Sequence, residues 1–507
     1  MNQAEFEEKY GHITRSSKNK QEKQLNSKLE PFLQNLTPSG CFKKENVKKI
    51  FINLLPIFGW LPSYKWRQYL QCDLITGLTV GIMVVPQGMA YATLAKVPPV
   101  YGLYSCFFPA FFYMFFGTSP HVSIGTFAVA SMMVGNLRSQ LIPENGNNNN
   151  TNTLIFEGEP LTPLVLISAL TFGVGIFQIL MAIFRLSFIT NYISDSLISG
   201  FTTGAAVHVL TSQLDKLIGV KVKSYGGPGL VLFVSNIKLC TQMCSSQMWK
   251  DLFISASNIN IFTVCISIFG LIFLSIGRDW INPIFRKRFK IPLPLELFLV
   301  IAAIILSATV GLKKNYGVRI VENVPQGMPN YSIPRLTLLQ HIWLDSLSIS
   351  IICYAFLFSL GKTFSKKHKY KLNANQELYA LSMCSLISSL FPVFPFGASL
   401  SRSALCEITG AKTQLHALFS SALLLVVILW IGPLLEPLPI AVLGCIVVVS
   451  LKPLFLQFKE LPKLWKINLF DFLIWIIAFT TTAFLNITFG LIISLFFSIL
   501  SIILKRN

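Results

Sequence analysis

An arginine lies among small hydroxyl residues at 399–403, directly after prolines interrupt an apolar stretch. The letters read Phe394-Pro395-Phe396-Gly397-Ala398-Ser399-Leu400-Ser401-Arg402-Ser403. A helix that begins here at membrane depth leaves its first backbone N–H groups unpaired and turns the positive end of its dipole toward whatever lies in front. Hydroxyl and N–H groups each contribute moderately to binding, which suits an anion that must bind and leave. The stretch therefore predicts an anion site containing Arg402 and its serine neighbours.

A second interrupted segment lies far earlier in the chain. It reads Ser123-Ile124-Gly125-Thr126-Phe127-Ala128-Val129, and its Gly-Thr step opens another short apolar helix. Two such segments in corresponding places of two halves point to the binding site of a transporter. We expect Thr126 to stand at this helix start, and the partly positive edge of the Phe127 ring to tolerate an anion there.

Arg402 has two interpretations. A charged arginine at bilayer depth costs on the order of 2.5–3.5 kcal/mol on insertion scales, so its presence requires a reason. Either it binds the anion, or it pairs with a carboxylate such as Glu407 or Glu296 or reaches a cytoplasmic headgroup. We favour anion binding, because the helix dipole and the positive charge of Arg402 both attract an anion to the first turns of a broken helix.

Three other polar residues lie in apolar surroundings. Glu296 is either a proton-coupling or charge-coupling group, or a partner for Arg402 or a cytoplasmic lysine. Gln87 and Tyr91 stand one turn apart after Pro86 and either face a cavity or pack in the core. The Pro86-Gln87-Gly88 step is expected to break the span that contains it.

The composition is that of a polytopic membrane protein. Hydrophobic residues make up 53% of the 507 residues and charged residues only 13%. The net charge of +20 reflects basic residues in the tail and connections, as the positive-inside rule predicts, so nucleic acid is not an expected partner. The ten cysteines are scattered, and no metal-ligand cluster, cofactor motif or nucleophile constellation stands out. An enzyme, a cofactor and a metal are therefore not expected.

Hydropathy and loop charge predict an all-α fold of fourteen transmembrane segments in a 7+7 inverted repeat. Because seven is odd, the two halves enter the membrane from opposite sides. Both termini are expected in the cytoplasm. Two connections are expected outside the cell, with glycosylation acceptors at Asn149 and Asn330. The predicted divisions are a cytoplasmic tail at 1–53, an interfacial segment at 54–71, the first repeat at 72–341 and the second at 342–507.

Several long motifs, in order along the chain, strongly resemble the SulP family of anion transporters, which includes sulfate permeases, animal chloride/bicarbonate/oxalate exchangers and the motor protein prestin. These motifs are DLITGLTVGIMVVPQGMAYA at 73–92, VPPVYGLY at 97–104, FGTS at 116–119 and ANQEL at 374–378. The resemblance implies a core domain moving against a gate domain, with the anion between the starts of the third and tenth helices. The family's site residues fall here on Gln87, Tyr91, Phe127, Leu400, Ser401 and Arg402, with Glu296 in the seventh span.

Three departures from the family pattern bear on function. Pro120 replaces an arginine, which removes a cation near the third span. Phe356 stands where proton-coupled sulfate members carry a glutamate, which favours exchange over proton symport. The chain ends at Asn507, where family members continue into a cytoplasmic STAS domain, so the homodimer that the family allows is less strongly expected.

The predicted function is exchange of sulfate or oxalate for chloride or bicarbonate by alternating access in an integral membrane protein of the plasma membrane. The alternatives are an uncoupled chloride channel of the same fold and a non-transporting, voltage-responsive membrane motor. Small inorganic or organic anions and the lipid bilayer are the expected partners.

Overall fold

The computed structural model describes residues 54–142, 155–156, 159–186, 194–220, 259–289, 292–322, 324–484 and 487–506. The predicted tail at 1–53 and the acceptor Asn149 lie outside these residues, whereas Asn330 is described and exposed. Two compact units divide the chain, Met1–Ser63 and Tyr64–Asn507. The described part of the first unit is a short helix, α4 (Ile57–Trp60), followed by a 3₁₀ turn (Leu61–Ser63).

Helices form nearly all of the second unit. Those of the first half of the chain are α5 (Trp66–Leu94), α6 (Val100–Phe116), α7 (Ala128–Leu141), α8 (Pro163–Ile183), α9 (Asp195–Ile218), α11 (Ile261–Ile276), α12 (Asn282–Phe289), α13 (Leu295–Val310) and α14 (Leu312–Tyr316). Those of the second half are α15 (Leu339–His368), α16 (Ala374–Ser388), α17 (Leu400–Thr409), α18 (Leu415–Val426), α19 (Ile440–Phe455), α20 (Leu461–Ile467), α21 (Leu469–Phe484) and α22 (Ile487–Arg506).

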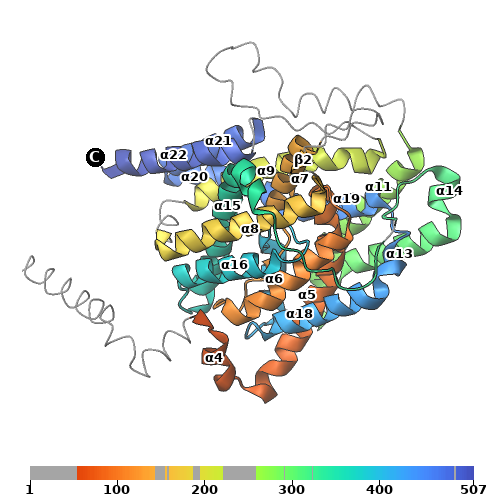
Figure 1. Cartoon of the computed structure of the whole chain (residues 1–507), viewed down its shortest axis with the longest axis horizontal. Helices are drawn as coiled ribbons and strands as arrows, with labels where there is room; N and C mark the ends of the chain where they lie inside the picture. The colour runs from red at the N-terminus through yellow and green to blue at the C-terminus, as the bar shows by residue number, and fades with distance from the viewer. Residues whose placement is uncertain are drawn as a thin grey trace, which may run out of the picture. The chain divides into compact units, whose positions relative to one another are not determined.

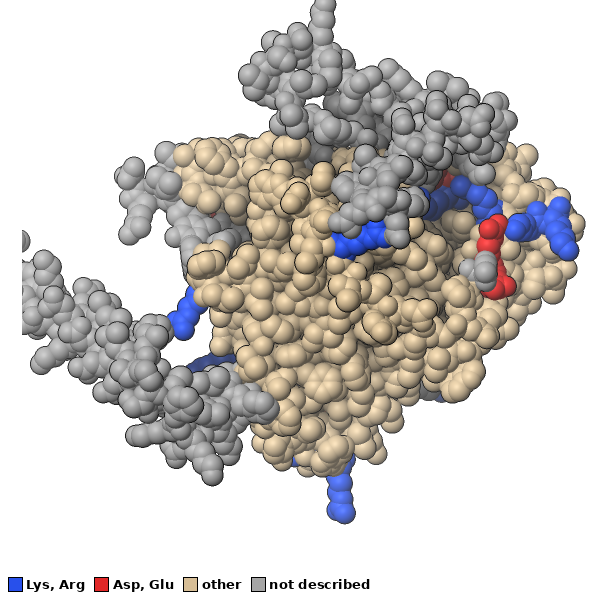
Figure 2. Space-filling view, in the orientation of Figure 1, with Lys and Arg blue, Asp and Glu red and all other residues tan. Residues whose placement is uncertain are grey.

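The helical segments have the length and composition of membrane spans. Within the described residues, six are long and apolar enough to cross a bilayer, and four more apolar helices are shorter. Figure 2 shows a face that is largely free of charged side chains through its middle, with lysines and arginines toward its margins. A mostly helical membrane protein is thus confirmed, while the arrangement of fourteen spans in two repeats stays a prediction.

The helices pack in two groups. The first helix group consists of α5, α6, α7, α8, α15, α16, α17 and α18, in which α8 packs on α16 and α5 on α18. Figure 1 shows α8 and α16 running side by side. The second helix group consists of α9, α11, α13, α19, α21 and α22, in which α9 packs on both α19 and α21. The most extensive contact between the groups is that of α5 with α19, and α7 also contacts α9 and α5 also contacts α13.

Two details of the prediction require correction. The expected break at Pro86-Gln87-Gly88 is wrong, because α5 continues through Pro86 to Leu94. Neighbouring helices satisfy the backbone groups that a proline frees inside a membrane, so a single proline need not end the helix. The fold is also not purely helical, since four strands of two residues occur: β1 (Ile124–Gly125), β2 (Ile155–Phe156), β3 (Glu159–Pro160) and β4 (Gly397–Ala398).

One of the two strand pairs brings the two halves of the chain together. β1 pairs with β4 in antiparallel register, with Ile124 opposite Ala398 and Gly125 opposite Gly397. The other pair, β2 with β3, is local in sequence. Both β1 and β4 are buried and each immediately precedes a short helix, so this pair fixes the position of α7 relative to α17.

Candidate anion-binding site

Two helix N-termini meet at the β1–β4 pair. α7 begins at Ala128 after an extended Phe127, and α17 begins at Leu400 after an extended Ser399. Neither N-cap residue makes a capping hydrogen bond with its side chain. The Ser399 hydroxyl instead lies 3.3 Å from the Ser401 hydroxyl. Because the first-turn N–H groups are not capped, both helix starts can donate to a negatively charged ligand.

Arg402 joins the two halves of the site. Its side chain is fully buried, and Nη1 donates a hydrogen bond of 2.8 Å to the backbone carbonyl of Thr126. The Nε and Nη2 atoms of the guanidinium have no hydrogen-bond partner in the described part of the chain. A buried cation with unused donors is costly unless a ligand supplies the missing acceptor. This arrangement suits an anion that is not part of the protein.

Neither carboxylate considered as a partner for Arg402 is paired with it in the described part of the chain. Glu407 pairs with Lys367 at 2.6 Å and with His368 at 2.9 Å. Glu296 lies half-buried in the first turn of α13, and among the described residues no hydrogen bond or ion pair holds its side chain. The structure therefore does not bring either glutamate to Arg402, and the pairing interpretation is wrong for the described residues.

Glycines on both strands make room for the large side chains of the site. A Cβ atom on Gly125 would lie 3.0 Å from Nη2 of Arg402, and Gly125 also has a φ of +156°. A Cβ atom on Gly397 would lie 2.8 Å from the Phe127 ring. The two paired residues at 125 and 397 must be small because the guanidinium and the phenyl ring pass directly over them.

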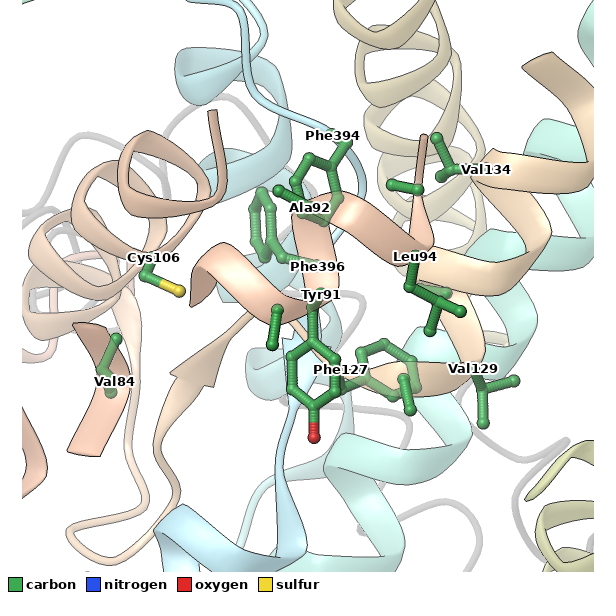
Figure 3. Packing of buried hydrophobic residues seen from close by; sticks show 14 of the residues in the cluster. Val84, Tyr91, Ala92, Leu94, Cys106, Phe127, Val129, Val134, Phe394 and Phe396 are labelled. Carbon is green, nitrogen blue, oxygen red and sulfur yellow. The ribbon is translucent and has the colours of Figure 1, made fainter. Parts of the chain in front are cut away.

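α5 contributes Gln87 and Tyr91, both buried and one turn apart. The Oε1 atom of Gln87 has no partner among the described residues, and the Tyr91 hydroxyl lies 3.2 Å from the Ser450 hydroxyl of α19. Figure 3 shows Tyr91, Phe127, Phe394 and Phe396 as members of one buried cluster. Thus α5, α7 and α17 together supply the predicted site residues.

The start of α17 is the accessible side of the site. Leu400 is 40% exposed and Ser401 is half-buried, whereas Thr126 and Arg402 are fully buried. Phe356 of α15 packs against Phe127 with 5.3 Å between the ring centroids. Phe356, at the position where the resemblance to the SulP family places a glutamate in proton-coupled members, is therefore an apolar side chain in contact with the site.

Two buried carboxylates fix the segments that lead into and out of the site. Asp73 of α5 accepts hydrogen bonds from the backbone N–H groups of Lys412 (2.8 Å) and Thr413 (3.2 Å), just beyond α17. Glu377 of α16 accepts from the N–H groups of Thr118 (3.0 Å) and Ser119 (3.2 Å), just before β1. The sequence motifs at 73–92 and 374–378 thus contain anchors for α17 and β1.

Sequence reasoning missed several residues that the fold brings to the site. Cys106 of α6 places its Sγ 3.2 Å from the Thr126 hydroxyl. Ser450 contacts Tyr91, as described above, and is followed two residues later by Lys452, which resembles an ordinary span end. No local pattern marks either residue, because each reaches the site only through helix packing.

The chain is similar to known proteins over most of its length. The model of the sulfate permease family matches residues 70–478. Prestin from Danio rerio is 36% identical over 483 residues, which cover 94% of this chain and 63% of the relative. Human solute carrier family 26 member 6 is 36% identical over 458 residues, which cover 90% and 58%. The chain thus spans less than two thirds of the length of these relatives.

Two solved structures have a similar fold. The structure of the murine Slc26a9 anion transporter in its inward-facing state matches with a TM-score of 0.82 and 30% identity, covering 94% of this chain and 75% of that one. The transmembrane domain of the cyanobacterial bicarbonate transporter BicA matches with a TM-score of 0.65 and 18% identity, covering 85% and 97%, which shows a likeness of fold alone. From the family match over most of its length, the chain belongs to the sulfate permease family.

Proposed function

We propose that this protein is a secondary active anion transporter whose substrate is held between the starts of α7 and α17. The observation that carries the proposal is the buried Arg402 guanidinium, which bridges to Thr126 and keeps two nitrogens without partners among the described residues. Two uncapped helix starts add backbone donors and dipole at the same place. Gln87, Tyr91, Thr126, Phe127, Leu400, Ser401 and Arg402 form the proposed substrate site.

The proposed mechanism is alternating access. The first helix group carries the whole proposed site. One of its contacts with the second helix group joins the hydroxyls of Tyr91 and Ser450. Movement of one group against the other would expose the anion to one side of the membrane and then to the other. The proposal keeps the predicted fourteen spans in two inverted repeats. It also keeps both termini in the cytoplasm and the protein in the plasma membrane.

The proposed reaction is exchange of sulfate or oxalate for chloride or bicarbonate. Phe356 supports exchange over proton symport, because it places an aromatic ring and no carboxylate against Phe127. Glu296 is the residue of the seventh span that remains available for charge coupling. The comparison with human solute carrier family 26 member 6 supports a carrier in general terms, and the particular anions are our proposal.

The test is counter-transport in proteoliposomes that contain the purified chain. Labelled sulfate uptake should accelerate several-fold when the vesicles hold trapped chloride in place of gluconate. Arg402→Gln should abolish this uptake, whereas Arg286→Gln, an equal loss of charge at an exposed position of α12, should retain it.

The same vesicles distinguish the rival functions. Uptake that does not depend on the trapped anion would count against exchange. Currents that reverse at the chloride equilibrium potential would indicate an uncoupled channel. Voltage-driven charge movement without any anion flux would indicate a membrane motor.

A further inference from the structure

Arg278 lies on a widened turn where the second helix group approaches the site. The turn Gly277–Ile281 is π-helical and joins α11 to α12. The Nη1 atom of Arg278 donates a hydrogen bond of 3.0 Å to the backbone carbonyl of Val449 in α19. π-Helical turns occur frequently at functional sites, because the extra residue redirects the side chains around it.

The charge of Arg278 is not neutralised by a carboxylate in the described part of the chain. The adjacent acid, Asp279, forms its ion pair with Lys452 instead. The bond to Val449 uses one of the five N–H donors of the guanidinium, and the side chain is half-buried. Arg278 therefore keeps a full positive charge and unused donors in a partly desolvated place, where attraction to an anion is stronger than in bulk water.

A short sequence of contacts connects Arg278 to the proposed substrate site. Val449, which accepts from Arg278, is followed by Ser450, whose hydroxyl contacts the Tyr91 hydroxyl. Through these two contacts Arg278 is connected to Tyr91 of the proposed substrate site.

We infer that the unused guanidinium donors of Arg278, beside the hydroxyl pair of Ser450 and Tyr91, form a second subsite for a small inorganic anion on the cytoplasmic approach to Arg402. The cytoplasmic side follows from the basic residues of α12 that come directly after the turn. The inference rests on the proposed function. It adds a contact supplied by the opposite helix group, so an anion entering from the cytoplasm meets Arg278 before Arg402.

The competing explanation is structural. In that case the Arg278 guanidinium only ties α11 to α19 through the Val449 carbonyl. Loss of that bond would lower stability at every anion concentration and leave the apparent anion affinity unchanged. Anion affinity and basal stability are therefore measured separately.

The experiment uses the purified full chain in detergent, with chloride as the probe and gluconate as the inert replacement. A ligand that binds the folded state stabilises it by RT ln(1 + [L]/Kd), so a fit of the unfolding temperature against chloride concentration gives the concentration of half-occupancy, here called the half-effective concentration. We expect Arg278→Gln to raise that concentration by about tenfold, a typical effect of losing one charge-assisted contact. Arg278→Lys should give a smaller rise, because it keeps the charge and loses the planar fork. Arg286→Gln serves as the control for loss of one positive charge and should match the wild type.

The outcomes separate this inference from the proposed function. An unchanged half-effective chloride concentration in Arg278→Gln overturns the subsite, even when wild-type vesicles exchange anions. A raised concentration in Arg278→Gln, together with wild-type vesicles that transport nothing, supports the subsite and overturns transport. If Arg278→Gln does not fold, Arg278→Lys decides, and wild-type chloride dependence in that variant overturns the proposal.

Discussion

The Nη1 atom of Arg402 donates a hydrogen bond of 2.8 Å to the backbone carbonyl of Thr126, so the arginine of α17 is held by the residue that follows β1. The bond orients the guanidinium without neutralising it, because a carbonyl carries no net charge.

Gly125→Ala should impair anion transport. The added methyl group would lie 3.0 Å from Nη2 of Arg402 and would occupy a backbone conformation that side chains rarely adopt. We expect sulfate uptake to fall at least ~10-fold, since a displacement of about 1 Å at a binding group carries costs of this size. The matched control is Gly444→Ala, where the new methyl group meets its nearest atom at an ordinary 3.4 Å and helix propensity rises. Equal uptake by both variants would contradict the packing of Gly125 against Arg402.

Asp73→Asn should destabilise the protein. The buried carboxylate accepts on one oxygen from two backbone N–H groups beyond α17 and on the other from the Thr413 hydroxyl, and in asparagine an amide nitrogen would replace one of these oxygens and face its donors. A buried donor left without its acceptor costs about 1–3 kcal/mol, so we expect a clear fall in unfolding temperature in detergent. Asp195→Asn, at an exposed first-turn position of α9, is the control and should change the unfolding temperature much less. Similar melting of the two variants would show that Asp73 is not an anchor of α17.

Acidification should destabilise the protein through His121. Burial lowers the pKa of His121 from its ordinary 6.5 to about 4, and the nearby His368, His416 and Lys412 act in the same direction, while Glu407 opposes them. The His121 ring stacks on His368 with 4.3 Å between centroids. Between these two pKa values the unfolded chain binds a proton at His121 that the folded chain does not.

The contribution of His121 is therefore fully present above pH 6.5 and is lost as the pH falls toward 4. The unfolding temperature should decrease over this interval, and His121→Gln should decrease less steeply. His341→Gln, at an exposed position of α15, should keep the wild-type pH dependence. A His121→Gln profile parallel to that of the wild type would exclude this residue as the source.

Phe356→Glu should make transport dependent on pH. The new carboxylate would replace a ring that lies 5.3 Å from the Phe127 ring and would repel an anion when ionised. We expect the half-saturating sulfate concentration to rise at least ~10-fold at pH 7.5, about 1.4 kcal/mol, and to recover on acidification. Phe356→Leu controls for the lost ring and should show no pH-dependent recovery. Recovery in both variants would show that position 356 does not face the anion.

The helix starts of the site could be predicted from sequence because their signals are local. Small and hydroxyl residues after a proline-broken apolar run mark the start of α17, and the Gly-Thr step marks the start of α7. The β1–β4 pair could not be predicted, since strands of two residues have no period and their pairing depends on contacts between distant parts of the chain. Nor does any local pattern link Ser450 to Tyr91, because that contact depends on how α19 packs against α5.

Two of the incorrect predictions have physical causes as well. Pro86 predicts a helix break in water, but in α5 it is an interior position of one continuous helix. Glu407 is five residues from Arg402 along the chain, yet its carboxylate pairs with Lys367 and His368 at the end of α15. Sequence proximity identifies possible ion pairs, and packing decides which of them form.

The β1–β4 pair also has a consequence for how the protein is made. Thr126 and Arg402 are 276 positions apart, and the backbone of Ile124 and Gly125 has no strand partner until Gly397 and Ala398 have left the ribosome. For most of translation the early half must therefore keep an unsatisfied polar edge among lipids or within the insertion machinery. Slow biogenesis, and recognition of late-truncated chains by quality control, are the expected costs of building one pocket from both halves of a polypeptide.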